Sequence, residues 1–458
     1  MEFNESQKRA VRHCDGPMLL LAGPGSGKTT VITHRIKYIT EEHGVRPDNI
    51  LVITFTKAAA KEMKGRFQEL CPGVRGVTFG TFHSVFFWML RNAYNYTAAN
   101  IVTDSEKYGV IRDSIDRHGF RYDSQEDFAK NVVGEIGNVK SGRVSLENYE
   151  STTMKPEDFR VVYDEYENFL RRCGKIDFDD MLVFTYELLS ERPDILKMWQ
   201  NKFRYILIDE FQDINMIQYD IVKLLAGERQ NVFSVGDDDQ SVYGFRGAAP
   251  AIMKKFPEDF HGTVIEYLNV NYRCSYDIVE CSKRIIQNNR DRYEKQLRSA
   301  FAAGQSDRVH IVKTDSMTEQ NKKIIDRITE LNRAGIPYRE MAIIFRTNTE
   351  PRALASKLME NGIPFLMKDN IPNIFTHFLA ENIFDYIRLA RGSRDRRTVL
   401  RIINKPNRYI SRDAFDSPVV NFEELRQNYK DKYRIVNNIN VLENDLERIS
   451  RLAPYAAV

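Results

Sequence analysis

Short apolar runs alternate with segments of helical period along the first part of the chain. Residues 18–21, 50–54 and 77–79 are apolar runs, and apolar residues then recur every three or four positions in the stretches between them. This alternation is typical of a parallel sheet built from βαβ units. We therefore expect an α/β protein with a parallel sheet near its N-terminus.

Apolar runs return at residues 205–208 and 232–235, and again at residues 309–312 and 342–345, so two sheets are expected. The intervening residues are charged and mostly helical in period, as Phe159, Val162 and Tyr166 illustrate. This pattern predicts a helical insertion over residues 93–200. A second helical region is expected from residue 376 onward.

Composition narrows the class of protein. The chain has 458 residues, which is too long for one compact core, and its content of 42% hydrophobic and 29% charged residues is ordinary for a globular protein. The net charge of +3 is almost neutral, so binding to a polyanion depends on local clusters of Lys and Arg. The five cysteines lack C-x-x-C spacing, and the first apolar run is too short for a signal or membrane helix, so we expect a cytoplasmic protein.

The strongest chemical signal is the segment AGPGSGKTT at residues 22–30, between an apolar run and a helical pattern. In a P-loop of this kind, glycines turn backbone N–H groups toward phosphates, Lys28 reaches the β and γ oxygens, and Thr29 ligates Mg²⁺. Ala22 replaces the first glycine of the strict pattern, and the alternative is a glycine-rich turn. The predicted ATP-binding residues are Gly25, Ser26, Gly27, Lys28, Thr29 and Thr30.

The segment YILIDEFQD at residues 205–213 places two carboxylates at the end of a predicted strand. Asp209 can hold Mg²⁺ through water, and Glu210 can accept a proton from the attacking water as general base. An Asp-Glu pair alone is a weak signal because surface turns contain many. Beside a P-loop, the pair predicts a hydrolytic site in which Lys28 and Glu210 are catalytic.

The segment VGDDDQSVYGFRGA at residues 235–248 follows another apolar run and is expected at the same edge of the sheet. Gln240 is predicted to be catalytic, touching the γ-phosphate and sensing its loss. Tyr243, Phe245 and Arg246 offer flat and cationic surfaces for bases and phosphates. The alternative is a polar loop whose aromatic residues pack into the core.

In order and spacing, these motifs resemble those of the UvrD-like superfamily 1 DNA helicases. Further matching segments run along nearly the whole chain: FNESQKRAV, ITFTKAAAKEM, GTFHS, KIDFDDML, LNVNYRC and IIFRTN. The resemblance implies that Gln7 reads adenine, that Tyr272 stacks on it, and that Arg273 reaches the γ-phosphate as a further catalytic residue. The implied DNA-binding residues are Phe55, Thr56, His83, Tyr243, Phe245, Arg246, Arg346 and Asn348.

Each of these residues has a plainer alternative. A phenylalanine such as Phe55 is more often a core residue than a platform for bases, and His83 is more often a packing or capping histidine than a ligand. Tyr272 can fill a seam between domains. Only the joint order of the motifs favours the functional interpretation.

The resemblance implies a P-loop NTPase with two RecA-like domains, each carrying a mainly helical insertion. The first RecA-like domain is expected at residues 1–92 and 201–264, with its insertion at 93–200. The second is expected at 265–375, with the start of its insertion at 376–458. ATP and Mg²⁺ are the implied cofactors. The implied partners are single-stranded DNA, junctions of single- and double-stranded DNA, and repair or replication proteins, with 3′ to 5′ movement, no membrane contact and a monomer in this form.

The chain departs from the family pattern in places. Thr30 stands where many members have arginine, and Phe245 stands where many have tryptophan, which puts one adenine contact and one stacking face in doubt. The family's last two motifs, one of which carries a second arginine finger, do not occur in the sequence. We therefore expect an incomplete second sheet and slow hydrolysis, since a missing finger costs about 10³ to 10⁵ in rate.

Other functions remain open at this point. The same motor core serves translocases that displace proteins from DNA and the motor parts of helicase-nucleases, and a DNA-binding module can use ATP without turnover. Basic residues are also crowded between positions 388 and 412. They can track duplex phosphates or form a solvated or intramolecular surface, and the sequence favours neither.

Overall fold

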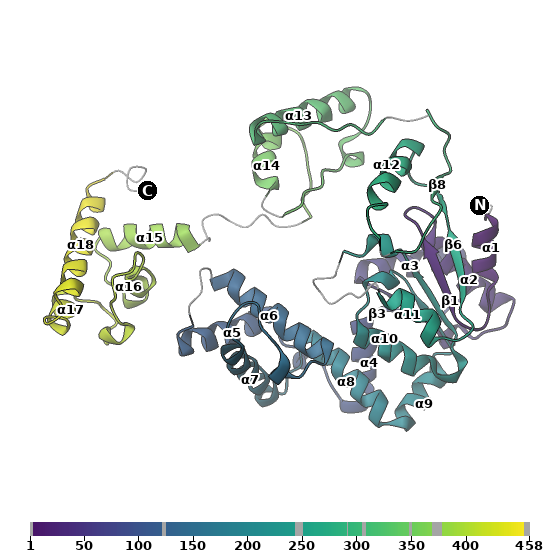
Figure 1. Cartoon of the computed structure of the whole chain (residues 1–458), viewed down its shortest axis with the longest axis horizontal. Coiled ribbons are helices and arrows are strands. Elements are labelled where there is room, and N and C mark those ends of the chain that lie inside the picture. Colours follow the sequence, from purple (N-terminus) through teal and green to yellow (C-terminus); the bar gives the residue numbers. More distant parts are fainter. Residues whose placement is uncertain are drawn as a thin grey trace. The chain divides into compact units, whose positions relative to one another are not determined.

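The computed structural model describes residues 3–120, 125–242, 251–290, 292–304, 308–347, 350–368 and 378–452. They form two units, Met1–His310 and Ile311–Val458 (Figure 1). Each unit is built around cores of its own, so each is described by itself. In the described part of the chain, no helix is both long enough and apolar enough to cross a membrane.

A six-stranded sheet forms the centre of the first unit, with strand order β3-β2-β4-β5-β1-β6. All its pairings are parallel. The carboxyl ends of the strands therefore share one edge, which is where parallel α/β sheets bind ligands. The strands are β1 (Met18–Ala22), β2 (Ile50–Thr54), β3 (Thr78–Thr81), β4 (Tyr205–Ile208), β5 (Val232–Gly236) and β6 (Val264–Leu268).

Helices surround this sheet and form the inserted region. Those of the first unit are α1 (Glu5–Arg12), α2 (Lys28–Glu41), α3 (Lys57–Leu70), α4 (Phe82–Tyr94), α5 (Asp104–His118), α6 (Gln125–Gly142), α7 (Pro156–Cys173), α8 (Phe178–Glu191), α9 (Pro193–Lys202), α10 (Met216–Ala226), α11 (Ala251–Asp259) and α12 (Tyr276–Ile286).

Alternate residues of each central strand enter different cores. Leu19 and Leu21 of β1 belong to a core shared with α4 and α8 to α11, whereas Met18 and Leu20 belong to a core shared with α1 to α3. Successive side chains of a strand point to opposite faces, so a strand covered by helices on both faces must be apolar throughout. This double coverage explains the unbroken apolar runs of the sequence.

Part of the predicted helical insertion, α5 to α7, packs around a core of its own, whereas α8 and α9 lie within the same predicted bounds but pack in the core shared with the sheet. Helices α5, α6 and α7 bury Ile111, Val132 and Tyr166, among others. Along α7 the buried positions Phe159, Val162, Tyr166 and Leu170 follow the helical period. These helices confirm the prediction of a helical region here. The helical period arises because each helix turns one apolar face to this core.

A buried lysine links α6 to α8. The side chain of Lys140 on α6 is 4% exposed, and its Nζ lies 3.0 Å from Asp177 Oδ2, 2.7 Å from Asp180 Oδ1 and 2.5 Å from Glu167 Oε1. Asp177 caps the start of α8 and forms a capping box with Asp180. The segment KIDFDDML therefore has a structural role, since its carboxylates neutralise an ammonium that is out of water.

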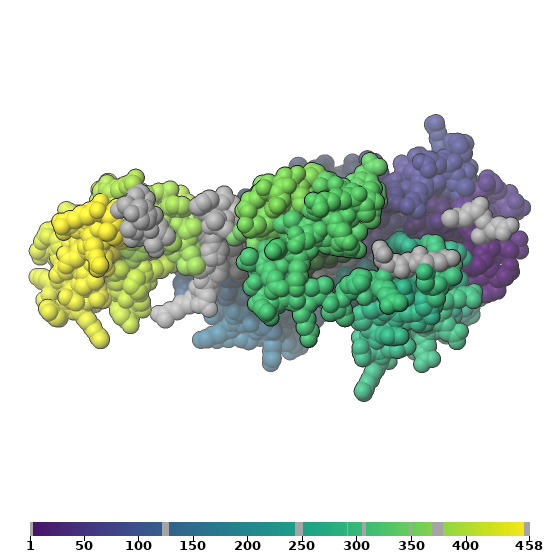
Figure 2. All heavy atoms as spheres, turned by 90° about the horizontal axis from the view of Figure 1, so that it is seen from above, coloured from purple at the N-terminus to yellow at the C-terminus, as the bar shows by residue number. Residues whose placement is uncertain are grey.

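The second unit is helical in its described residues and is coloured green to yellow in Figure 2. Its first two helices pack through Leu354 and Leu358, and its last four enclose a separate core that includes Ile439, Leu442 and Leu446. The helices are α13 (Met317–Arg333), α14 (Pro351–Glu360), α15 (Phe378–Ala390), α16 (Arg396–Ile402), α17 (Phe422–Asn428) and α18 (Tyr433–Ser450).

Strand predictions hold in the first unit and fail in the second. Within the described residues, 309–312 and 342–345 form no strand, and Ile311 and Ile344 are 89% and 92% exposed. An apolar run becomes a strand of a parallel sheet only where neighbours bond its backbone and helices cover it. The apolar pattern alone does not show whether a neighbouring strand or a covering helix is present.

Two further strand features were not predicted. β6 adds an edge strand beside β1 at residues where the domain boundary was expected, and β7 (Val270–Asn271) pairs in parallel with β8 (Arg298–Ser299). The exposed residues of β6 and the shortness of β7 and β8 hide them from an apolar pattern. The domain limits stay predictions.

Replacing Lys140 with alanine should lower the free energy of unfolding of the first unit by about 3 to 5 kcal/mol, because buried carboxylates lose their counter-ion. Lys130→Ala removes an exposed lysine of the same helix and should change the free energy of unfolding little. Urea unfolding followed by circular dichroism measures both. Equal effects of the two variants would contradict a structural role for the buried cluster.

Burial, followed by the charge of Asp177, raises the pKa of Asp179 to about 6. Because this folded-state pKa exceeds that of the unfolded chain, the charged form opposes folding as pH rises through 6. Asp179→Asn should therefore raise the melting temperature more at pH 8 than at pH 5. Asp113→Asn, at an exposed position of α5, should show no such difference, and a pH-independent effect of Asp179→Asn would contradict the assignment.

Candidate nucleotide and DNA site

The predicted P-loop connects β1 to α2 at the carboxyl edge of the sheet. Gly25 and Gly27 have φ angles of 65° and 86°, a region that glycine enters without strain, and Gly27 is the N-cap of α2. The Ser26 hydroxyl donates to the Gly23 carbonyl at 2.6 Å. Thr29 and Thr30 follow in the first turn of α2, partly buried. The unpaired N–H groups of this helix end favour an anion such as a phosphate.

Lys28 and Glu210 form an ion pair between the P-loop and the end of β4. The Lys28 Nζ lies 2.7 Å from the Glu210 Oε2, with the side chains 13% and 35% exposed. Glu210 has a left-handed φ of 52°, a strained conformation for a residue with a side chain. Burial raises the pKa of Glu210, but the charge and hydrogen bond of Lys28 outweigh burial and hold it below the ordinary value.

Asp209 lies beside this pair at the end of β4. Its backbone N–H donates to the Ile53 carbonyl at 2.9 Å, and its side chain is buried. Burial, followed by the charge of Glu210, raises the pKa of Asp209 to about 6. The buried Oδ1 has no hydrogen-bond partner in the structure. A buried carboxylate oxygen with no donor fits a position that faces a hydrated cation, because such an atom otherwise pays its full desolvation cost.

Gln240 lies at the end of a short 3₁₀ turn after β5. Its Nε2 donates to Asp237 Oδ2 at 2.6 Å. The backbone N–H of Asp237 in turn donates to Gln212 Oε1 at 2.9 Å, and Gln212 Nε2 donates to Glu210 Oε2 at 3.0 Å. The structure therefore connects Gln240 to the Lys28 and Glu210 pair through hydrogen bonds. Gln212, in the middle of this path, was not singled out from the sequence.

The two residues expected at adenine lie against the P-loop. Gln7 of α1 is buried, and its Nε2 donates to the Ser26 carbonyl at 3.0 Å. The backbone N–H of Tyr272 donates to the Gly25 carbonyl at 2.9 Å, and its hydroxyl accepts from Asn4 Nδ2 at 2.9 Å. Asn4 also caps α1 and shares a capping box with Gln7. It is a further residue at this site, and its N-cap position was the only signal in the sequence.

Arg273 also lies next to the P-loop. A Cβ built on Gly25 would stand 2.7 Å from Arg273 Cβ and 2.8 Å from Asn271 Oδ1. Any side chain at this position would therefore clash, and glycine fits. The buried Asn271 accepts from the backbone N–H groups of Arg273 and Cys274 at 2.8 and 2.7 Å. Asn271 thus fixes the turn that carries Tyr272 and Arg273, a role that sequence reasoning missed.

The residues expected to contact DNA follow β2 and β3. Phe55 is partly buried, and Thr56 caps α3 by accepting from the backbone N–H of Ala59 at 3.1 Å. The ring of His83 packs edge-on against Phe178, with centroids 5.5 Å apart, and burial lowers the pKa of His83. Phe178 is 49% exposed although it lies in an otherwise structural segment. An exposed phenylalanine inside KIDFDDML is a candidate that the sequence analysis passed over.

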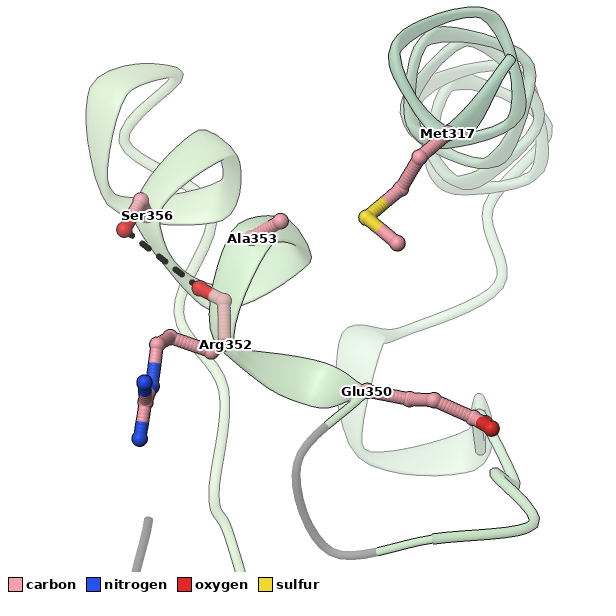
Figure 3. Close-up of a pocket in the computed structure, with 5 residues that line it drawn as sticks. All are labelled: Met317, Glu350, Arg352, Ala353 and Ser356. Carbon is pink, nitrogen blue, oxygen red and sulfur yellow. Dashed lines mark hydrogen bonds between the residues drawn. The ribbon is translucent and has the colours of Figure 1, made fainter. Parts of the chain in front are cut away.

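Four of the expected DNA-binding residues, Tyr243, Phe245, Arg246 and Asn348, lie outside the described residues. Arg346 belongs to the second unit, where its backbone N–H donates to Glu350 Oε2 at 3.1 Å. That unit also has a surface hollow of about 380 Å³. Its lining residues are Met317, Glu350, Arg352, Ala353 and Ser356 (Figure 3). None of these lining residues was expected at the nucleotide.

The basic residues between 388 and 412 divide into two groups. Arg388 and Arg401 both bind the buried Asp385, and the buried Arg408 donates to the Ile402 and Ile403 carbonyls. These side chains stabilise the second unit. Arg394 is half-buried and donates to the Leu389 and Ser393 carbonyls. Arg388 is exposed in spite of its ion pair, as are Arg391, Arg396, Arg397, Lys405 and Arg412. Much of the cluster is therefore intramolecular, which reduces the number of charges available to a duplex.

Comparison with known proteins agrees with this geometry. Residues 3–261 match the model of the UvrD/REP helicase N-terminal domain, and residues 266–449 match that of the UvrD-like helicase C-terminal domain. The chain is 35% identical to the ATP-dependent DNA helicase PcrA of Staphylococcus epidermidis over 421 residues, 89% of this chain and 56% of that protein. It is 33% identical to PcrA of Staphylococcus aureus over 451 residues, 96% of this chain and 59% of that protein.

The chain thus spans somewhat more than half the length of these relatives. The N-terminal family model alone accounts for residues 3–261, which include the P-loop, the paired carboxylates and Gln240. This match covers more than half of the chain, and the parallel sheet brings the matched site residues to one edge. The chain therefore belongs to the UvrD/REP helicase family.

Proposed function

We propose that the chain is the ATP-binding part of a motor that couples ATP hydrolysis to movement along single-stranded DNA. The observation that carries this proposal is the contact between Lys28 and Glu210 beside the buried, unpartnered Oδ1 of Asp209. A phosphate-binding lysine, a general base and a metal-binding carboxylate then lie at one edge of the sheet. Phosphoryl transfer to water depends mainly on holding groups of these kinds in position around the phosphates.

Lys28 and Glu210 are expected to separate when nucleotide binds. The ammonium of Lys28 then moves from the carboxylate to the β and γ oxygens, which carry more charge. Glu210 loses the positive charge that holds its pKa low, and so becomes a better acceptor for the proton of the attacking water. In the absence of nucleotide, the same ion pair keeps both groups neutralised in a partly buried site.

The residues around the pair fit Mg²⁺ and ATP. Asp209 and the Thr29 hydroxyl offer the oxygen ligands that Mg²⁺ prefers, partly through water. When bound there, the ion would offset the negative charge that develops on the phosphate oxygens. Tyr272 and Gln7 flank the P-loop on the side of α1, where they can hold the adenine, and Arg273 lies against Gly25 where it can approach the phosphates.

The aromatic surface near the carboxyl ends of β2 and β3 supports single-stranded DNA as the track. Phe55 with Thr56, and His83 with Phe178, can stack on bases or contact the backbone, and every base has a face that tolerates such stacking. Arg346, Tyr243, Phe245, Arg246 and Asn348 complete the proposed DNA contacts. By family resemblance, movement is 3′ to 5′, junctions of single- and double-stranded DNA are substrates, and repair or replication proteins are partners.

Replacing Glu210 with glutamine should lower the rate of ATP hydrolysis by about 10² to 10⁴, because the general base is lost while the shape of the side chain is kept. ATP binding should remain within a few-fold of the parent chain. Steady-state phosphate release, with and without single-stranded DNA, measures the rate, and Glu228→Gln at an exposed position is the control. Unchanged, DNA-stimulated hydrolysis in Glu210→Gln would refute the proposed role.

Replacing Phe178 with alanine should weaken binding to single-stranded oligonucleotides about tenfold or more, as expected when one stacked base loses its platform. ATP affinity should be unaffected, since Phe178 is not part of the P-loop site. Fluorescence anisotropy with a labelled oligonucleotide gives the Kd. Phe301→Ala is a matched control because that phenylalanine is 46% exposed. A loss of equal size in the control would argue against a specific stacking surface.

A further inference from the structure

A short segment after α12 contacts several parts of the nucleotide site at once. We call residues 292–299 the strap. Arg292 binds Asp239 through two hydrogen bonds of 2.7 and 2.5 Å, and a Cβ built on Gly23 in the P-loop would stand 2.6 Å from the strap's Leu297. The strap ends in β8, which pairs with β7 directly before Tyr272. It therefore touches the loop after β5, the P-loop and the turn that carries Arg273.

Lys295 is the centre of these contacts. Its Nζ bonds to Asp237 Oδ1 and lies 2.5 Å from Asp238 Oδ1 and 2.8 Å from Asp239 Oδ2. The lysine side chain is 4% exposed, and that of Asp237 is fully buried. Burial lowers the pKa of Lys295, but the adjacent carboxylates outweigh it and raise the pKa above the ordinary value. The lysine thus stays charged and, together with Arg292, offsets most of the charge of three consecutive carboxylates.

The carboxylates of these aspartates converge closely enough to hold a metal ion, with their ligand atoms within 4.8 Å of one another. Lys295 already supplies the positive charge at that position. A divalent cation would have to displace or face this buried ammonium, at the cost of strong repulsion. The cluster is therefore a lysine-centred ion network, and its function must lie in what it holds in place.

Asp237 joins this network to the catalytic residues. Its Oδ1 bonds to Lys295, and its Oδ2 accepts one amide hydrogen of Gln240 at 2.6 Å. The Gln240 amide has a second N–H, which can donate to a phosphate oxygen. Without Lys295, Asp237 would be a buried carboxylate beside two more carboxylates, and would have to protonate or turn toward water. Either change removes the acceptor that orients Gln240.

We propose that Lys295 is a positioning residue that fixes Asp237, and through it the amide of Gln240, in the orientation that detects the γ-phosphate. This inference rests on the proposed role of Gln240 at the γ-phosphate. It also assigns the strap a function, because the same residues that hold Gln240 are continuous with β8 and hence with Tyr272 and Arg273. The strap thereby connects the loop after β5, which carries Gln240, directly to the β7–β8 ribbon.

The test compares ADP with the non-hydrolysable ATP analogue AMP-PNP, each with Mg²⁺. The ratio of their Kd values isolates recognition of the γ-phosphate, because both nucleotides use the same P-loop. In Lys295→Met the ratio of Kd for ADP to Kd for AMP-PNP should fall about tenfold, the contribution of one hydrogen bond to a charged group, with ADP affinity within about threefold. Lys283→Met, which removes a lysine paired with Glu280 on α12, should leave the ratio unchanged.

A second variant guards against simple misfolding. Lys295→Met combined with Asp238→Asn keeps the net charge of the cluster but still releases Asp237, so its ratio should fall as well. A folded variant that keeps the parent ratio overturns the proposal, as does an equal loss of ADP and AMP-PNP affinity. Since the measurement needs neither DNA nor turnover, absence of DNA-stimulated hydrolysis would count against the motor function alone.

Discussion

The ion pair between Lys28 and Glu210 places opposite charges from two neighbouring motifs within 2.7 Å of each other, in a partly buried position. Neither charge is stable there alone, because each would lose water without gaining a partner. The surrounding structure supplies the means to hold them. Gly27 allows the turn that starts α2, and Glu210 accepts a strained φ of 52° at the end of β4. The phosphate site is thus kept in a compact, neutralised state.

From this pair, hydrogen bonds and ion pairs extend in one direction through Gln212 to Asp237 and Lys295. Every polar group along this path that is removed from water has a partner, which makes the path rigid and costly to interrupt. Beside the path, Asp209 Oδ1 and Asp213 Oδ1 are buried with no hydrogen-bond donor. Of these two oxygens, that of Asp209 belongs to the carboxylate that we propose binds the metal ion.

The same distinction applies to the charged clusters elsewhere. Lys140 with Asp177 and Asp180 is a buried network that joins helices, and the buried Asp385 joins helices through the more exposed Arg388 and Arg401. Charged sequence motifs therefore serve two purposes in this chain: some join helices, and others form the proposed ligand site. Burial and the identity of the partner atoms, rather than the charge pattern, show which purpose each one serves.

The sequence by itself determined five of the six strands of the first sheet and the type of nucleotide site. The local patterns are the unbroken apolar runs, the P-loop and the adjacent Asp209 and Glu210. Because each pattern lies within one short segment, the bounds of these strands were predicted to within a residue or two. Only the tertiary structure decided which distant groups meet. The roles of Asn271, Gln212 and Lys295, and the exposure of Phe178, depend on contacts between segments far apart in the chain. The strand predictions at residues 309–312 and 342–345 were wrong for the same reason. A strand of a parallel sheet forms only where neighbouring strands bond its backbone and helices cover it, and these are distant segments.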